Sequence, residues 1–161
     1  MERIHKIQNH PVYKEEYRLL TEAEKERFFC RHTMEHFLDV ARLMYIYNLE
    51  EDAGIDKELI YAAALLHDIG RYEQISKGTP HHIAGARLAG EIMDDCGFSK
   101  SEIIIVQEAI AGHREAKNDT NQHTLAAYLY RADKRSRNCF ICNAYDACNW
   151  PEEKKNRLIN E

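Results

Sequence analysis

An imidazole and a carboxylate stand side by side at the end of an apolar run in this sequence. Residues 62–66 are three alanines and two leucines, and His67 and Asp68 follow them directly. Burying either polar side chain without a partner costs about 2–7 kcal/mol. The pair therefore predicts a partner or a bound ligand that satisfies both groups.

Three other polar side chains occupy similar positions in separate apolar segments. His36 lies on an apolar helical stripe, His113 follows the run IIIVQEAIAG, and Asp133 lies within LAAYLYRADK. Each residue alone is typical of a buried side chain with a protein partner, and that interpretation stays open. Their repetition in four segments also fits one shared metal ion, because imidazole and carboxylate groups are common metal ligands.

Helical periodicity dominates the segments that must position these residues. Apolar residues recur at spacings of three and four, and few segments alternate strictly. The sequence therefore predicts an all-α, single-domain helical bundle of about five to seven helices. Residues 1–138 would form this domain, including an N-terminal helical extension. Residues 139–161 would form a cysteine-rich tail that packs on the same domain and ends in a short charged helix after Pro151.

Local signals predict the first helix boundaries. Pro11 can open a helix, and TEAE at 21–24 has the form of a capping box that would start another helix running into the forties. Residues 57–69 form an apolar helix. The glycine- and proline-bearing segment GRYEQISKGTP, residues 70–80, is the longest predicted loop.

Similar signals mark the later helices. Pro80 suits the first turn of the next helix, and Gly97 is placed to stop it. SKSE at 99–102 is a second capping box, which would start a helix that ends near His113. Residues 123–137 form the last long predicted helix.

The composition is that of a globular chain. The sequence has 161 residues, 44% apolar and 30% charged, which fits one domain with a real core. No apolar run is long enough to span a bilayer, and residues 1–11 lack the apolar core of a signal peptide, so we expect a cytoplasmic protein without a membrane partner. The net charge of −5 argues against extended nucleic acid as a partner.

Six histidine and aspartate residues also occur in a recognisable order, in contexts that include LLHDIG and RADK. They are His36, His67, Asp68, His81, His113 and Asp133. This order resembles the HD superfamily of metal-dependent phosphohydrolases, which is named for the adjacent His-Asp pair. The resemblance covers about residues 30–137. In size and spacing the chain is similar to the two-metal members, which include bacterial hydrolases of diadenosine tetraphosphate.

The resemblance implies two sets of metal ligands. The first metal would be bound by His36, His67, Asp68 and Asp133. The second would be bound by His81 and His113, with Asp68 bridging. His82 adjoins His81 and is an alternative ligand, while His32, one turn before His36, would support the site or have a structural role. One or two divalent ions would bind, with iron, manganese, magnesium, zinc and cobalt as candidates.

A bridged metal pair implies hydrolysis of a phosphoester or phosphoanhydride by a metal-activated water. His67 and Asp68 would be the catalytic residues, and Asp68 can accept the proton of the water. The substrate would be a small phosphorylated molecule, and we expect it to be a nucleotide. Basic residues adjacent in sequence to the ligands would bind its phosphate. They are Arg71, Arg114, Lys134 and Arg137.

Two other functions use the same residues. Histidine and carboxylate ligands suit a di-iron centre that activates oxygen, and some HD-fold proteins are similar in that respect. A non-catalytic nucleotide-sensing domain is the other alternative. A homo-oligomer is compatible with each of these functions.

The cysteines suggest a second site. Five cysteines without an export signal argue against a disulfide framework. Cys139, Cys142 and Cys148 form a CxxC followed by a third cysteine. If the segments of Cys30 and Cys139 are helical and antiparallel, Cys30 could complete a four-cysteine set for structural zinc or an iron–sulfur cluster. Buried or free thiols are the simpler interpretation, and both stay open.

Overall fold

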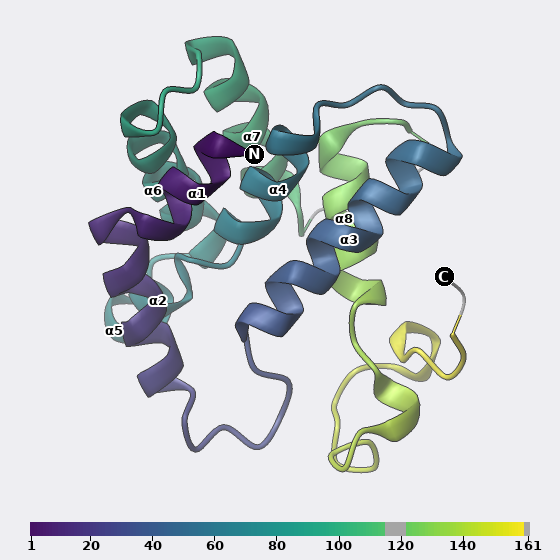
Figure 1. Cartoon of the computed structure of the whole chain (residues 1–161). Helices are drawn as coiled ribbons and strands as arrows, with labels where there is room; N and C mark the ends of the chain where they lie inside the picture. The colour runs from purple at the N-terminus through teal and green to yellow at the C-terminus, as the bar shows by residue number, and fades with distance from the viewer. Residues whose placement is uncertain (115–121, 160–161) are drawn as a thin grey trace.

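The computed structural model describes residues 1–114 and 122–159, which form helices and connections without a strand. The helices are α1 (Glu2–Asn9), α2 (Pro11–Ala23), α3 (Met34–Glu50), α4 (Lys57–Leu66), α5 (Arg71–Lys77), α6 (His81–Asp95), α7 (Lys100–Gly112), α8 (Leu125–Arg135), and the 3-10 helices η2 (Cys139–Ile141) and η3 (Glu152–Lys154) (Figure 1). The predicted all-α class is confirmed. In the described part of the chain, no helix has the length and apolar character needed to cross a membrane.

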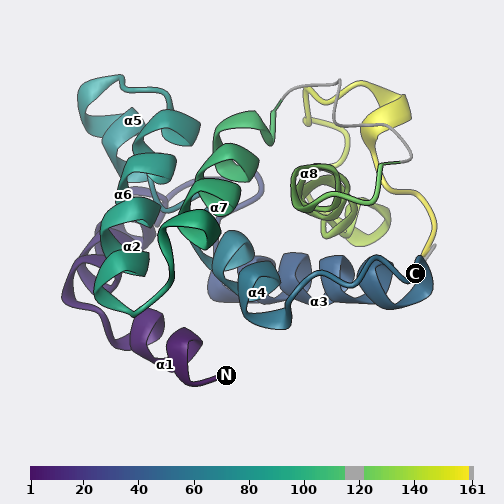
Figure 2. The ribbon, with the colours of Figure 1, turned by 90° about the horizontal axis from the view of Figure 1, so that it is seen from above.

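Helix α4 lies at the centre of the bundle. It contacts α1, α3, α6, α7 and α8, and its residues 62–66 are fully buried. Its three consecutive alanines let neighbouring helices approach from several sides. Figure 2 looks almost along the axis of α8 and shows α3 and α4 passing beside it. The apolar run therefore delivers His67 and Asp68 into the interior, where both are buried.

The predicted helix start at residues 21–24 is wrong. Thr21 lies inside α2, where its hydroxyl donates to the carbonyl of Tyr17 at 2.9 Å. Helix α3 begins at Met34, and Thr33 is its N-cap. The amphipathic face of α2 continues through the fully buried Leu20, so TEAE ends one helix and does not start the next.

Residues 70–80, predicted as a loop, contain the helix α5. Gly70 precedes this helix as its N-cap, and Gly78 follows it with φ of +80°, a left-handed conformation that favours glycine. The amide of Gly78 donates to the carbonyl of Gln74 at 3.0 Å. Gly70 therefore marks the start of a short helix, and Gly78 and Pro80 follow its end. The many turn-forming residues in this segment led to its prediction as a loop.

Several other predicted boundaries are present. Ser99 and Glu102 form the capping box of α7, with each side chain accepting from the backbone of the other residue. Pro80 is the N-cap of α6, and Gly97, with φ of +87°, follows its C-cap. Helix α7 ends at Gly112, directly before His113.

The C-terminal tail packs on the end of α8 (Figure 1). The side-chain amide of Asn156 donates to the carbonyls of Lys134 at 2.7 Å and Arg137 at 2.8 Å. Arg137 in turn donates through Nη1 to the carbonyl of Arg31 at 2.9 Å, which joins this region to the connection before α3. The short helix after Pro151 is η3. A domain boundary at residue 138 stays a prediction.

Candidate metal centre

The four side chains predicted for the first metal come together in the structure. His36 lies in the first turn of α3, His67 and Asp68 follow α4, and Asp133 lies in the last turn of α8. One possible ligand atom of each residue lies within 4.8 Å of the others. The Nε2 atom of His67, for example, lies 3.2 Å from Asp68 Oδ2 and 3.7 Å from Asp133 Oδ1.

Asp68 also belongs to a second group, because its two carboxylate oxygens face different imidazoles. Its Oδ2 lies 3.2 Å from His67 Nε2 and 4.0 Å from His36 Nε2. Its Oδ1 lies 3.3 Å from His81 Nε2 and 4.0 Å from His113 Nε2. Asp68, His81 and His113 thus form a group within the same 4.8 Å limit. One oxygen toward each group is the arrangement that a bridging carboxylate requires.

Close backbone packing brings α6 to the turn after α4. A Cβ atom on Gly70 would lie 2.4 Å from the nitrogen of Gly85 and 2.5 Å from the carbonyl oxygen of His81. A Cβ atom on Gly85 would lie 3.1 Å from the carbonyl oxygen of His67. The two glycines therefore allow a contact that a larger residue at 70 would prevent. This backbone contact places His81, and not the alternative His82, in the second group with Asp68 and His113.

In each of the four ligand histidines, the Nδ1 atom of the ring points away from the carboxylates of Asp68 and Asp133 and toward a hydrogen-bond acceptor. The acceptors are the carbonyl of Ala64 for His67 (2.8 Å), the carbonyl of Ile110 for His113 (2.6 Å), Oε1 of Gln74 for His81 (2.5 Å) and Oγ of Ser136 for His36 (3.0 Å). An Nδ1–H that donates in this way leaves Nε2 available as a metal ligand. Within residues 1–114 and 122–159, the buried Nε2 atoms of His67 and His81 have no hydrogen-bond partner. The donor set therefore fits a divalent metal ion.

Burial keeps three of these imidazoles neutral. It lowers the pKa to about 4 for His36, about 3 for His81 and about 4 for His113. Burial also acts on His67, but there the carboxylates of Asp68 and Asp133 outweigh it and raise the pKa to about 10. Without metal, the proton on His67 balances the same two carboxylates that a cation would balance. Metal binding would therefore displace this proton.

Sequence reasoning missed Glu24, which holds His32 against the cluster. Glu24 and His32 are both buried. Glu24 accepts from the His32 backbone N–H at 2.7 Å and from Nδ1 of the ring at 2.7 Å. The other ring nitrogen of His32 lies 3.4 Å from Asp68 Oδ2. Glu24 gave no signal because it lies in the polar connection after α2, eight residues from its partner.

Two of the predicted phosphate-binding residues lie on the side of the second group. The Nε atom of Arg71 donates to Asp68 Oδ1 at 3.0 Å. Burial lowers the pKa of His81, and the charges of Arg71 and Arg114 add to this effect, so both cations act on the site.

The other two predicted basic residues, Arg137 and Lys134, differ in position. The Nη2 atom of Arg137 lies 3.0 Å from His36 Nε2, at the edge of the first group. The Nζ atom of Lys134 lies 3.3 Å from the centroid of the Tyr130 ring on the same helix. Arg137 is therefore in direct contact with the cluster, whereas Lys134 contacts the ring of Tyr130 and, at 3.5 Å, its carbonyl oxygen.

The cysteines do not join these groups. Within the described residues, the sets of three or more possible ligands within 4.8 Å are the two above, and neither contains a cysteine. Burial raises the pKa of Cys30, and the charges of Cys139, Cys142 and Cys148 add to the shift, so the four thiols lie in one region. Cys96 is part of the hydrophobic core. A four-cysteine metal or iron–sulfur site stays a prediction.

Comparison with known proteins identifies the family. A model of the HD domain matches residues 33–138, a range that contains all six predicted ligands. The chain belongs to the HD domain family. A predicted HD superfamily hydrolase from an uncultured Thermotogales bacterium has a similar crystal structure, with a TM-score of 0.62 and 25% identity, over 88% of this chain and 80% of that one. The predicted superfamily and the HD-type helical fold are confirmed.

Three further proteins are similar to this chain in sequence. An uncharacterized protein of Clostridium beijerinckii is 46% identical over 136 residues, 84% of each chain. Ribonuclease Y of Oleidesulfovibrio alaskensis is 31% identical over 127 residues, which are 79% of this chain. Ribonuclease Y of Clostridium kluyveri is 25% identical over 150 residues. The chain spans 22% and 29% of the length of these two ribonucleases.

Proposed function

We propose that this HD domain protein is a metal-dependent phosphohydrolase with two metal positions, acting on a phosphoester or phosphoanhydride of a small molecule, most naturally a nucleotide. The observation that carries the proposal is the carboxylate of Asp68, which has Oδ2 at 3.2 Å from His67 Nε2 and Oδ1 at 3.3 Å from His81 Nε2. His36 and Asp133 complete the ligands on the first side. His113 completes those on the second.

The donor set restricts the choice of metal. Imidazole nitrogen suits iron, zinc and cobalt, and carboxylate oxygen suits manganese and magnesium. Four imidazoles with two carboxylates therefore favour iron, manganese, zinc or cobalt over magnesium, which prefers oxygen ligands and retained water. When bound, two such ions would polarise a phosphoryl oxygen and lower the pKa of the attacking water.

The side chains of the protein would perform the remaining work. Asp68 would accept the proton of the attacking water, and His32 would receive it through the 3.4 Å contact between its Nε2 and Asp68 Oδ2. Glu24 fixes the His32 ring and would stabilise the imidazolium. Arg71 and Arg137 would bind phosphate oxygens, because each lies at one edge of the cluster.

The names of the relatives support hydrolysis over the two alternatives. One similar structure is described as a hydrolase, and several relatives are ribonucleases, which cleave phosphodiester bonds. A di-iron oxygen-activating enzyme and a nucleotide-sensing domain would use the same donors, but no relative reported above bears such a name. The diadenosine tetraphosphate hydrolase-like subtype, the cytoplasmic location and a homo-oligomeric state stay predictions.

A phosphate-release screen tests the proposal. The protein is purified without oxygen, its metal content is measured, and it is assayed with manganese, iron, cobalt, zinc and magnesium on nucleotides and other phosphoesters. Oxygen consumption is followed in parallel. We expect phosphate release that a chelator abolishes and added metal restores. Oxygen consumption without phosphate release would support the di-iron enzyme, and full metal occupancy with neither activity would support the sensing domain.

His82→Ala provides a matched control for the screen. His82 neighbours His81 in sequence but is not part of either ligand group. We expect His81→Ala to lower phosphate release by at least about tenfold and His82→Ala to retain it. Equal activity of the two variants would contradict the assignment of His81 as a ligand.

A further inference from the structure

Two segments that are far apart in the sequence carry four of the five cysteines, and Arg137 joins these segments. Cys30 directly precedes Arg31, whose carbonyl oxygen accepts from Arg137 Nη1 at 2.9 Å. The carbonyl oxygen of Arg137 accepts from the backbone N–H of Cys139 at 3.0 Å. Two hydrogen bonds of one residue therefore connect the neighbour of Cys30 to the first cysteine of the C-terminal tail.

Three hydrogen-bonded turns in series carry the other three cysteines. Cys139 begins η2, and the N–H of Cys142 donates to its carbonyl at 3.1 Å. Side chains three residues apart in a 3-10 helix lie one above the other, so this CxxC pair shares one side of the turn. The N–H of Tyr145 then donates to the carbonyl of Cys142 at 3.1 Å, and that of Cys148 to the carbonyl of Tyr145 at 3.2 Å. These turns keep Cys148 close to the pair.

The tail has almost no hydrophobic core of its own. Within residues 139–159, the buried side chains are those of Cys139, Ala144 and Asn156. The loop between Cys142 and Cys148 is instead closed by Lys155, whose Nζ donates to the carbonyl of Tyr145 at 3.2 Å. Small units that cannot bury enough apolar surface commonly depend on disulfides or a structural metal ion. The five cysteines of this chain are free.

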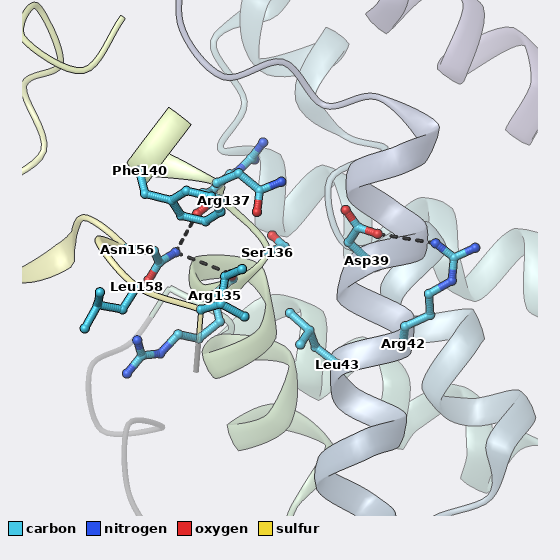
Figure 3. Close-up of a pocket in the computed structure, with 11 residues that line it drawn as sticks. Asp39, Arg42, Leu43, Arg135, Ser136, Arg137, Phe140, Asn156 and Leu158 are labelled. Atoms are coloured by element: carbon cyan, nitrogen blue, oxygen red, sulfur yellow. Dashed lines mark hydrogen bonds and ion pairs between the residues drawn. The ribbon is translucent and has the colours of Figure 1, made fainter. Parts of the chain in front are cut away.

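The tail also leaves an open space where it faces α3. Figure 3 shows Phe140 and Leu158 of the tail on one side of a cavity of about 200 Å³ and Asp39 of α3 on the other. Ser136 lines the same cavity, and its Oγ lies 3.0 Å from His36 Nδ1, so the cavity lies beside His36. Phe140 is 47% exposed and Leu158 is 74% exposed. Packing against α3 therefore does not replace the missing core.

The thiols have the chemistry of a metal site. Four sulfur ligands that include a CxxC pair are a usual ligand set for structural zinc. Burial raises the pKa of the Cys30 thiol, the other three thiols of the set add to the rise, and the charge of Arg137 opposes it. A divalent cation among the four sulfurs would reverse the rise, because it favours thiolates.

The sulfurs would have to move to share one ion. In the part of the chain that the structure describes, no three of them lie within 4.8 Å of one another. Rotation about the Cα–Cβ bond moves a cysteine sulfur between staggered positions without moving the backbone. Cys30 is exposed and Cys142 and Cys148 are partly exposed, so their side chains have room to rotate. Metal sites of this kind commonly form as the ion binds.

We propose that a structural zinc ion binds to the tail and to the connection before α3, through Cys30, Cys139, Cys142 and Cys148. The ion would displace the thiol protons, and the step needs no oxidant or reductant. It would fix the tail, which lacks a core, to the HD domain. The proposal is independent of the proposed hydrolysis, because none of the four cysteines belongs to the two ligand groups of the metal centre.

Cobalt absorption tests the ligands without any need for turnover. Reduced, metal-free protein is titrated with cobalt(II), which gives a sulfur-to-cobalt charge-transfer band only with thiolate ligands. We expect this band in the wild type and in Cys96→Ala, the control in the hydrophobic core, and its loss or weakening in Cys30→Ala. Added zinc should remove the band by displacing cobalt. No band in the wild type, or an equal band in Cys30→Ala, would overturn the proposal.

A second measurement uses only the wild type, so it does not depend on how the variants fold. The rate of thiol alkylation is followed by mass spectrometry with zinc, with magnesium and with chelator. We expect zinc at tenfold its Kd to slow alkylation of Cys30, Cys142 and Cys148 about tenfold, and magnesium, which prefers oxygen ligands, to have no effect. Equal rates with zinc and with chelator would contradict the site.

Chemical analysis distinguishes zinc from an iron–sulfur cluster. A cluster contains inorganic sulfide as well as iron, whereas a zinc site contains none. Protein purified without oxygen is therefore analysed for zinc, iron and acid-labile sulfide. We expect zinc without sulfide, and iron with sulfide would overturn the assignment of zinc.

Discussion

Gly70 and Gly85 approach so closely that a methyl group on Gly70 would lie 2.4 Å from the backbone nitrogen of Gly85. Gly70 follows the His-Asp pair by two residues, and Gly85 lies one turn after His81. This contact packs the start of α6 against the turn that carries Asp68. It therefore fixes the distance between the two sides of the proposed metal centre.

Gly70→Ala should separate these segments. The new methyl group meets backbone atoms, which cannot rotate away, so we expect a loss of about 1–3 kcal/mol in the free energy of unfolding and a lower content of bound metal. Gly90→Ala, in helix α6, is the control, because its methyl group would meet only the flexible end of the Gln107 side chain. Thermal melting and metal analysis compare the variants. Equal losses in both would show that the backbone contact at Gly70 has no special role.

Replacement of His81 and His113 by alanine should remove one of two metal ions. Both residues contact only the Oδ1 side of Asp68, and the first ligand group is left intact. We expect the metal content per chain to fall by half, with the fold retained. The number of metal ions bound per chain is measured after dialysis against a buffer that contains a trace amount of the metal. An unchanged metal content would refute the second site.

The metal-free protein should lose stability as the pH falls from about 6.5 to about 4. In the folded state burial lowers the pKa of His36 and His113 to about 4 and that of His81 to about 3. The unfolded chain binds these protons near pH 6.5, so below that pH protonation favours unfolding. Each proton taken up contributes up to about 1.4 kcal/mol per pH unit.

Denaturant midpoints measured in chelator at pH 7, 6 and 5 check this dependence. We expect a steady decrease toward pH 5 and a smaller decrease in His81→Gln, which lacks one of the three groups. Midpoints that do not change over this range would contradict the buried, neutral state of these imidazoles.

Serine replacement of Cys139 and Cys142 should lower the melting temperature before it affects hydrolysis. Cys139 is buried at the start of η2, and both residues follow the last proposed ligand, Asp133. Thermal melting and phosphate release are measured on the same preparation, together with its zinc and iron content. Loss of turnover at an unchanged Tm would indicate a redox or catalytic role for these thiols.

The sequence predicted those parts of the site that depend on local pattern. His67 and Asp68 could be recognised because a buried helix ends in two polar residues, and the other ligands could be recognised by their order and local contexts along the chain. The structure brings all six into two overlapping groups. The capping box at 99–102 was equally predictable, since both of its partners lie within one turn.

Features that depend on tertiary contacts could not be predicted in this way. Glu24 acts on His32 across a connection with no periodicity, and Gln74 reaches His81 from α5, a helix concealed among glycines. The cavity beside His36 needs the tail to fold back onto α8 through Asn156. None of these contacts leaves a signal in the spacing of residues along the chain.

The most direct test of the account is an anomalous-difference map from crystals grown with manganese. We predict two peaks, one on each side of the Asp68 carboxylate and about 3.5–4 Å apart. The first would lie within coordination distance of His36, His67 and Asp133, and the second within coordination distance of His81 and His113. A map with no peak at Asp68, or with manganese bound only elsewhere, would contradict the central claim.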